Sequence, residues 1–184
     1  MLIALAGVTG VGKSYFKDKI VERLNFEKIK IITTRKIRIG EKNNEDKIFV
    51  TTEEFNNLKS SNIIAYDFDM LGNKYAYSKD ALFSNKNTVF ELHYTTIFDL
   101  KQICPNMTTI YILPTNIKMA KEQTRKRHLD KNVENSRLLE IDEHYNRFLT
   151  DENLRNKFDY ILYNNYDKNS EDQIINLVKK IIDK

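Results

Sequence analysis

The chain has 184 residues, of which 41% are hydrophobic and 30% are charged, with a formal net charge of +4 and one cysteine. This length suits a single domain with a real core, and the composition excludes disordered and membrane-spanning classes, because no run approaches the ~20 apolar residues that cross a bilayer. The lone Cys104 excludes an internal disulfide and suits a reducing cytoplasm. The mild positive charge does not call for a nucleic-acid partner, and we expect a monomer or homodimer with no membrane partner.

The first element is a short apolar strand, residues 2–6, that leads into a glycine-rich loop. The loop reads Gly7-Val8-Thr9-Gly10-Val11-Gly12-Lys13-Ser14, which fits the pattern G-x-x-x-x-G-K-[ST], and residues 15–24 then have helical spacing. Its N–H groups can wrap a triphosphate, and we expect side chains in place of its glycines to block that approach. Lys13 can reach the β- and γ-phosphates, and the Ser14 hydroxyl can ligate Mg²⁺. The predicted triphosphate contacts are Gly7, Thr9, Gly10, Val11, Gly12, Lys13, Ser14 and Tyr15, with Ser14 as metal ligand.

A segment of different character follows the β-branched strand predicted at residues 29–33. It contains a charged loop, a short strand at 48–50, a capped helix start at 51–55, and two aromatic-rich strands near 63–68 and 75–77. We expect a small mixed insertion, residues 35–77, on a core of residues 1–34 and 78–184. An insertion of this kind can hold a second substrate.

The rest of the chain alternates predicted helices and strands. Alternation of this kind favours a parallel sheet covered by helices on both faces, with ligands beyond the carboxyl ends of its strands. The predicted strands are 88–92, 108–113 and 158–163, and the predicted helices are 79–83, 94–103, 116–127, 133–149 and a C-terminal segment with apolar residues from 174 to 182.

Several motifs together resemble the guanylate kinase family. Thr33-Thr34-Arg35-Lys36-Ile37-Arg38-Ile39-Gly40-Glu41 is similar to that family's T-T-R-x-x-R-x-G-E, and Gly72-Asn73-Lys74-Tyr75 is similar to its G-N-x-Y-G. With the glycine loop, the resemblance covers nearly the whole chain. It implies a three-layer α/β/α P-loop kinase core with a helical lid at about residues 123–137, in one domain spanning 1–184. It also implies Mg²⁺-dependent phosphoryl transfer from ATP to a nucleoside monophosphate.

The resemblance also implies roles for charged residues outside the loop. Arg35 and Arg38 could grip the acceptor phosphate through forked hydrogen bonds, with Tyr75 adding a hydroxyl and Glu41 supporting the loop. In the lid, the cluster that ends at His128 contains Arg125 and Arg127, and Arg137 follows; such arginines close over the transferring group. The predicted catalytic residues are Lys13, Arg35, Arg125, Arg127 and Arg137. The alternative is that these arginines form solvated surfaces and take no part in phosphate binding.

The base-reading positions depart from the family. Tyr66 stands where the family has an acidic residue that selects guanine, and Glu91-Leu92-His93 replaces its D-x-D. Tyr66, Tyr77 and His93 could form a different base pocket or could be core aromatics, and Glu91 could act near Mg²⁺ through water. The predicted acceptor contacts are Arg35, Arg38, Glu41, Tyr66, Tyr75, Tyr77, Glu91 and His93.

The sequence therefore leaves the identity of the phosphate acceptor undetermined. The leading hypothesis is a nucleoside monophosphate kinase acting on GMP, dGMP or another nucleotide. Alternatives are a kinase for ribosyl phosphates on the same scaffold, or a non-catalytic binding module. The module has no physical need for Lys13 and Ser14.

Overall fold

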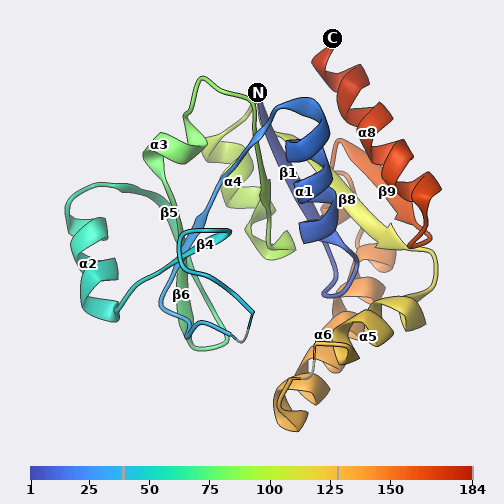
Figure 1. The fold of residues 1–184 in the computed structure, drawn as a ribbon, viewed down its shortest axis with the longest axis horizontal. Coiled ribbons are helices and arrows are strands. Elements are labelled where there is room, and N and C mark those ends of the chain that lie inside the picture. The colour runs from blue at the N-terminus through green and yellow to red at the C-terminus, as the bar shows by residue number, and fades with distance from the viewer. Residues whose placement is uncertain (39, 128, 184) are drawn as a thin grey trace.

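The computed structural model describes residues 1–38, 40–127 and 129–183, and its core is a five-stranded sheet (Figure 1). The strands lie in the order β2-β7-β1-β8-β9, and each neighbouring pair is parallel. Their bounds are Leu2–Gly7 for β1, Glu27–Lys28 for β2, Thr88–Glu91 for β7, Thr108–Pro114 for β8 and Tyr160–Asn164 for β9. The α/β class with a parallel sheet, predicted from the sequence, is confirmed.

Helices cover both faces of this sheet. Alternate side chains of β1 explain the arrangement: Ile3 and Leu5 pack in one apolar cluster with α1 and α8, whereas Ala4 and Ala6 pack in a second cluster with α4. The predicted three-layer core is therefore confirmed. The helices are α1 Lys13–Leu24, α3 Lys79–Leu82, the 3₁₀ turn η1 Tyr94–Thr96, α4 Ile97–Ile103, α5 Ile117–Arg125, α6 Lys131–Thr150, α7 Glu152–Arg155 and α8 Lys168–Ile182.

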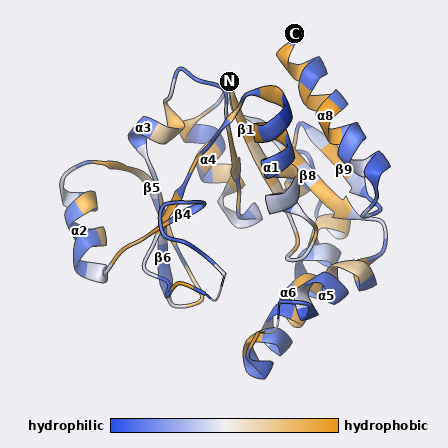
Figure 2. Ribbon diagram, viewed as in Figure 1, coloured by the Kyte–Doolittle hydropathy of each residue, from blue (hydrophilic) through white to orange (hydrophobic). Residues whose placement is uncertain are grey.

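The core sheet and the projecting ends of α5 and α6 differ in hydropathy. Figure 2 shows hydrophobic residues gathered in β1 and β8, while the projecting ends of α5 and α6 are mainly hydrophilic. No helix within the described residues is long and apolar enough to cross a membrane. The projecting helices carry the cations that the sequence assigns to a lid.

A second, mixed sheet lies beside the core. Its strands are β3 Ile31–Thr33, β4 Lys47–Phe49, β5 Ile64–Met70 and β6 Asn73–Ser78, in the order β4-β3-β6-β5. α2, Thr52–Ser60, begins with the predicted cap: the Thr51 hydroxyl accepts from the Glu54 N–H, and the Glu54 carboxylate accepts from the Thr51 N–H. A small core of Ile32, Phe55, Ile64 and Ala76 joins helix and sheet.

One predicted element is divided between the two sheets. Residues 29–33 were expected to form one strand of the parallel core, but β2 supplies the core strand and β3 pairs with β4 and β6 in the second sheet. The Ile29 N–H still donates to Val89 O on the core side, at 3.0 Å, whereas Ile32 already lies opposite Ala76. A β-branched run suits either sheet, and partners remote in sequence decide between them. The short α7 was not predicted.

Candidate active site

A cleft of about 1310 Å³ is lined by residues of the phosphate loop, the second sheet, α6 and the segment between α5 and α6. Figure 1 shows these elements around the carboxyl end of β1. Many predicted site residues line the cleft. They are Gly7, Thr9, Gly10, Gly12, Lys13, Ser14, Tyr15, Arg38, Glu41, Tyr75, Tyr77, Glu91, His93, Arg127 and Arg137. Four other predicted residues, Val11, Arg35, Tyr66 and Arg125, are not among the cleft-lining residues of the described chain.

The fold itself requires glycines in the loop, in addition to the access for phosphate expected from the sequence. Gly10 and Gly12 have φ values of 80° and 90°, which are left-handed and disfavour any side chain. A Cβ at Gly10 would lie 2.2 Å from the carbonyl oxygen of Ala120, and one at Gly7 would lie 2.4 Å from that of Ile112. Side chains there would therefore collide with the backbone of α5 and β8, before any phosphate is considered.

Two residues from the end of β9 brace the loop from behind. Buried Asn164 donates from Nδ2 to Val11 O at 2.9 Å, and the Tyr166 hydroxyl donates to Gly10 O at 3.2 Å. These bonds satisfy loop carbonyls, and α1 follows its N-cap Gly12 with no side chain capping its first N–H groups. The loop therefore offers free backbone donors to an anion at the positive end of a helix. Sequence reasoning did not predict this bracing.

Lys13 lies in the centre of the cleft's charged groups. Its ammonium donates to Gly7 O at 2.9 Å and Val8 O at 3.0 Å. Burial lowers its pKa to about 8, with Arg127 and Arg137 adding to the fall and Glu91 and Glu140 opposing it. The lid cations thus act on the loop lysine, as expected if one anion is to be held among them. Val11, by contrast, is fully buried and offers only its backbone.

On the insertion side, the two motif arginines have different surroundings. Arg35 is bound through one guanidinium nitrogen to both carboxylate oxygens of Glu41, at 2.8 and 2.9 Å, and lies over the Phe49 ring. Arg38 instead lines the cleft, and burial followed by repulsion from Arg35 and Arg137 lowers its pKa. Glu41 also accepts from the Arg38 N–H at 2.9 Å. Glu41 therefore organises the loop that presents Arg38.

The aromatic wall of the cleft is centred on Phe68, which sequence reasoning did not single out. Its ring stacks on Tyr75, with centroids 5.4 Å apart, and lies 6.4 Å from the ring of His93. Tyr77 is buried, and its hydroxyl donates to Glu91 O at 2.9 Å, so it joins the insertion to the core. Tyr66 stacks beside Phe68, with centroids 6.0 Å apart, but its hydroxyl donates to Asp99 of α4 at 2.7 Å. Phe68 stands two residues after Tyr66 on the same strand, so side-chain alternation could have placed Phe68 on the same face as Tyr66.

A buried lysine that the sequence analysis missed controls Glu91. The Lys17 ammonium lies 2.9 Å from Glu91 Oε1 and 3.1 Å from Asp46 Oδ1, and its side chain is only 4% exposed. Burial opposes ionisation of Glu91, but Lys17 and then Lys13 outweigh it and hold its pKa at about 2. Asp46 belongs to the loop before β4, so Lys17 ties α1 to the insertion. The signal in the sequence was that Lys17 stands next to Phe16 and three residues before Ile20, on the buried side of α1.

In the lid, Arg127 and Arg137 both line the cleft, whereas Arg125 is exposed at the end of α5. Arg137 donates to Glu140 one turn later on α6. His128, from the same basic cluster, lies outside the described residues, as does Ile39 of the arginine loop. His93, at the end of β7, has a pKa lowered to about 4 by burial and then by His144. Its imidazole is therefore neutral at pH 7.

Comparisons with known proteins identify the family of this chain. The profile of the family described as guanylate kinase matches residues 1–184. A guanylate kinase from Malacoplasma penetrans is 26% identical, over 100% of this chain and 95% of its own length. One from Onion yellows phytoplasma is 28% identical, over 97% of this chain and 85% of its own length. The crystal structure of guanylate kinase from Anaplasma phagocytophilum has the same fold, with a TM-score of 0.72 and 23% identity over 98% of this chain and 85% of that one.

Proposed function

Because this chain belongs to the guanylate kinase family and is therefore an ATP-dependent nucleoside monophosphate kinase, we propose that its cleft carries out the transfer with weak selection for guanine. One observation carries the placement of the reaction. Lys13 of the loop, Arg38 of the insertion, and Arg127 and Arg137 of the lid all line the same cleft. Four cations from three elements are suited to hold two phosphate chains end to end.

The donor side fits a triphosphate. The loop's N–H groups are uncapped, and Lys13, now bonded to two loop carbonyls, can turn its ammonium toward the β- and γ-phosphates. Ser14 would hold Mg²⁺ through its hydroxyl, with Glu91 supplying a carboxylate through water, and oxygen donors of this kind suit Mg²⁺. When bound, the ion neutralises charge on the β- and γ-oxygens. The predicted roles of Thr9, Gly10, Val11, Gly12 and Tyr15 at the triphosphate stay with this proposal.

On the acceptor side, Arg38 holds the monophosphate and Tyr75 adds a hydroxyl donor. Arg35 was predicted to bind the same phosphate directly. The pairing of one of its guanidinium nitrogens with both oxygens of Glu41 supports a different role, in which Arg35 and Glu41 fix the loop that presents Arg38. We accordingly assign the insertion, residues 35–77 with β3 as an added strand, to acceptor binding.

Lid residues 123–137 supply the remaining charge. Arg127 and Arg137 stabilise the transferring phosphoryl group, since charge develops on its oxygens in the transition state. Both already influence the pKa of Lys13, which supports their position around one anion. Arg125, which is not among the cleft-lining residues of the described chain, is the weakest of the predicted lid residues. Closing of the lid would exclude water, which otherwise competes with the acceptor.

The base-facing wall supports weak selection. Tyr66 bonds to Asp99 and does not line the cleft, and the wall is built from Phe68, Tyr75, Tyr77 and neutral His93. Rings of this kind stack on any base, because every base has a π face. Strong discrimination needs buried hydrogen-bond partners, each of which contributes ~1–3 kcal/mol. Tyr66 and His93 stand where the family has carboxylates, so this chain lacks two such partners and the means to prefer guanine strongly.

The experiment is a coupled ADP-release assay with Mg·ATP and one acceptor at a time: GMP, dGMP, AMP, CMP, UMP, TMP and ribose 1,5-bisphosphate. We expect turnover with GMP and with at least one other base, with kcat/KM values within ~100-fold of each other, as loss of about two hydrogen bonds implies. A preference for GMP of ~10⁴-fold, the level that a hydrogen-bonding pocket reaches, would contradict weak selection.

Ribose 1,5-bisphosphate is included because the Tyr66 hydroxyl is engaged by Asp99, which favours a second candidate, a ribosyl-phosphate acceptor. Turnover with that compound alone would replace our proposal with it. Silence across the whole panel would favour the non-catalytic module. We place the activity in the cytoplasm, where ATP and monophosphates are both available.

A further inference from the structure

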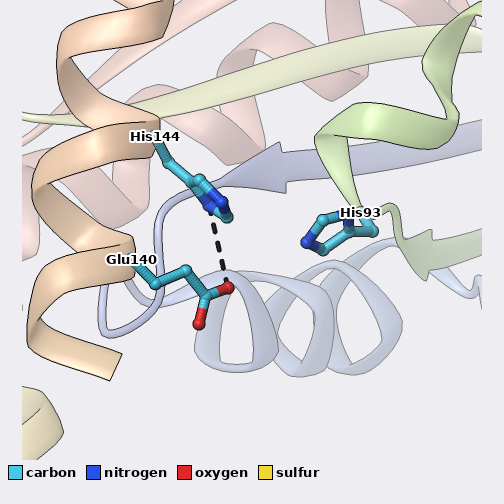
Figure 3. A group of neighbouring side chains, drawn as sticks. All are labelled: His93, Glu140 and His144. Carbon is cyan, nitrogen blue, oxygen red and sulfur yellow. Dashed lines mark ion pairs between the residues drawn. The ribbon is translucent and has the colours of Figure 1, made fainter. Parts of the chain in front are cut away.

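Three side chains that can bind a metal ion meet at the wall of the cleft, beside α6. Figure 3 shows His93, after the end of β7, facing Glu140 and His144, which lie one turn apart on α6. One ligand atom from each lies within 4.8 Å of the others, and all three side chains are partly buried. The i, i+4 spacing places Glu140 and His144 on one helix face. The cluster combines segments about fifty residues apart in sequence.

Neighbouring groups orient each of the three side chains. His93 Nδ1 lies 2.7 Å from Thr95 Oγ1, which leaves Nε2 to face α6. Arg137 donates to Glu140 Oε2, so Oε1 is left on the side of His144, 3.8 Å from Nδ1. The Tyr94 ring packs against the His144 imidazole with centroids 4.2 Å apart. Outer partners of this kind fix ligand tautomers and orientations in metal sites.

We propose that His93, Glu140 and His144 bind a divalent transition-metal ion of the zinc class. Two imidazoles and one carboxylate are a donor set that zinc accepts with a fourth position open, and here that position would face the cleft. Mg²⁺ demands oxygen ligands in near-octahedral geometry, so this site differs in chemistry from the one at Ser14. The inference does not depend on phosphoryl transfer.

Such an ion would connect the core to the lid. His93 is fixed to the core through β7, whereas Glu140 and His144 belong to the helix that begins in the lid and carries Arg137. A metal bridge between them would hold α6 against the end of β7. The bridge would stabilise the folded protein whenever zinc is present, because an ion that binds only the native state raises its stability.

The test is a titration of the metal-free, nucleotide-free full chain. Zn²⁺ is added in competition with a chromophoric chelator, and Co²⁺ is added separately to report ligation through its visible absorption. We expect one equivalent of Zn²⁺ that excess Mg²⁺ does not displace, a Co²⁺ spectrum that Zn²⁺ abolishes, and a rise in Tm with Zn²⁺. An unchanged Tm with no uptake of either ion would overturn the proposal.

Variants assign the site. His93→Ala, Glu140→Gln and His144→Ala should each weaken Zn²⁺ binding by more than the ~10–100-fold seen when an outer partner is lost, and abolish the rise in Tm. Circular dichroism checks that each still folds. Glu143→Gln, on the exposed face of the same helix, and His128→Ala, the third histidine of the sequence, should bind as the unaltered chain does. Equal Zn²⁺ affinity in the three cluster variants, or its loss in either control, would place the ion elsewhere and contradict the assignment.

Discussion

The phosphate loop and the base-facing wall form two sides of one cleft, but they are built in different ways. The loop is one contiguous segment that offers main-chain N–H groups, and its glycines are fixed by contacts with the chain's own backbone at Ala120 and Ile112. The wall is a set of side chains, Phe68, Tyr75, Tyr77 and His93, brought together from β5, β6 and the end of β7.

This difference separates the two tasks of the enzyme. In the proposed function the loop supplies affinity and catalysis, because backbone donors bind phosphate whatever base the nucleotide carries. The same proposal gives the choice of base to the side chains of the wall. Their replacement can change selectivity without affecting the loop. Variants on the two sides should therefore separate turnover from selectivity.

The largest effect is expected on the loop side. Lys13→Ala removes the cation nearest the transferring group, and we expect kcat to fall by ~10³-fold or more for every acceptor. ADP release measures the fall, and an unchanged Tm shows that the fold is intact. Lys19→Ala, on the same helix and paired at the surface with Glu22, is the matched control and should keep full activity. Undiminished turnover in the Lys13 variant would mean that the loop is not the donor site.

Lys17 links α1, which follows the phosphate loop, to the insertion and to β7. Of the replacements considered, that of Lys17 should lower the stability of the fold most. Lys17→Met leaves Glu91 and Asp46 without their shared cation, which we expect to cost about 3 kcal/mol of unfolding free energy, at the low end for buried pairs because both carboxylates are partly exposed. Urea unfolding measures it. Lys86→Met, which removes an exposed pair with Glu27, should cost no more than ~1 kcal/mol. Equal losses in the two variants would show that the buried network is unimportant.

Arg38→Ala should act on the acceptor and spare the donor. Loss of a charged hydrogen-bonding group, ~1.5–3 kcal/mol, predicts a fall of ~10–100-fold in kcat/KM for every monophosphate, with little change in ATP binding. Lys36→Ala, exposed on the same loop, is the control. A fall in ATP affinity with acceptor use unchanged would show that the insertion has been assigned to the wrong substrate.

The smallest effect is expected from pH. Burial lowers the Lys13 pKa to about 8, so the free enzyme loses this charge as pH rises through that value. We expect kcat/KM for ATP to decline above it, and kcat to decline only at higher pH, because bound phosphate favours the charged lysine. Lys13→Arg keeps its charge throughout this range. Persistence of the same decline in that variant would assign it to another group.

The sequence predicted most of what is contiguous. The loop, the strand before it, the helix after it and the Thr51–Glu54 cap depend on neighbouring residues, and each was found where expected. The three layers followed from the alternation of helices and strands. Residues 29–33 were misplaced because a β-branched run suits either sheet, and partners such as Ala76 are remote in sequence.

Site residues that depend on tertiary contacts were harder to predict. Tyr66 matched a motif position, but its rotamer and its bond to Asp99 depend on how α4 packs. Lys17 reads as an ordinary surface lysine until the fold brings Glu91 to it from β7 and Asp46 from the loop before β4. Asn164 braces the loop from 153 residues away. In each case the chemistry lies in a pair of residues, and a single sequence does not show the pair.

The most direct test of the account is inhibition by adenosine joined to guanosine through five phosphates, a compound long enough to occupy both halves of one cleft. The account predicts one molecule bound per chain, inhibition competitive with both ATP and the monophosphate, and weakened binding in both Lys13→Ala and Arg38→Ala. Competition with one substrate alone, or an affinity unaffected by Arg38→Ala, would contradict a shared cleft.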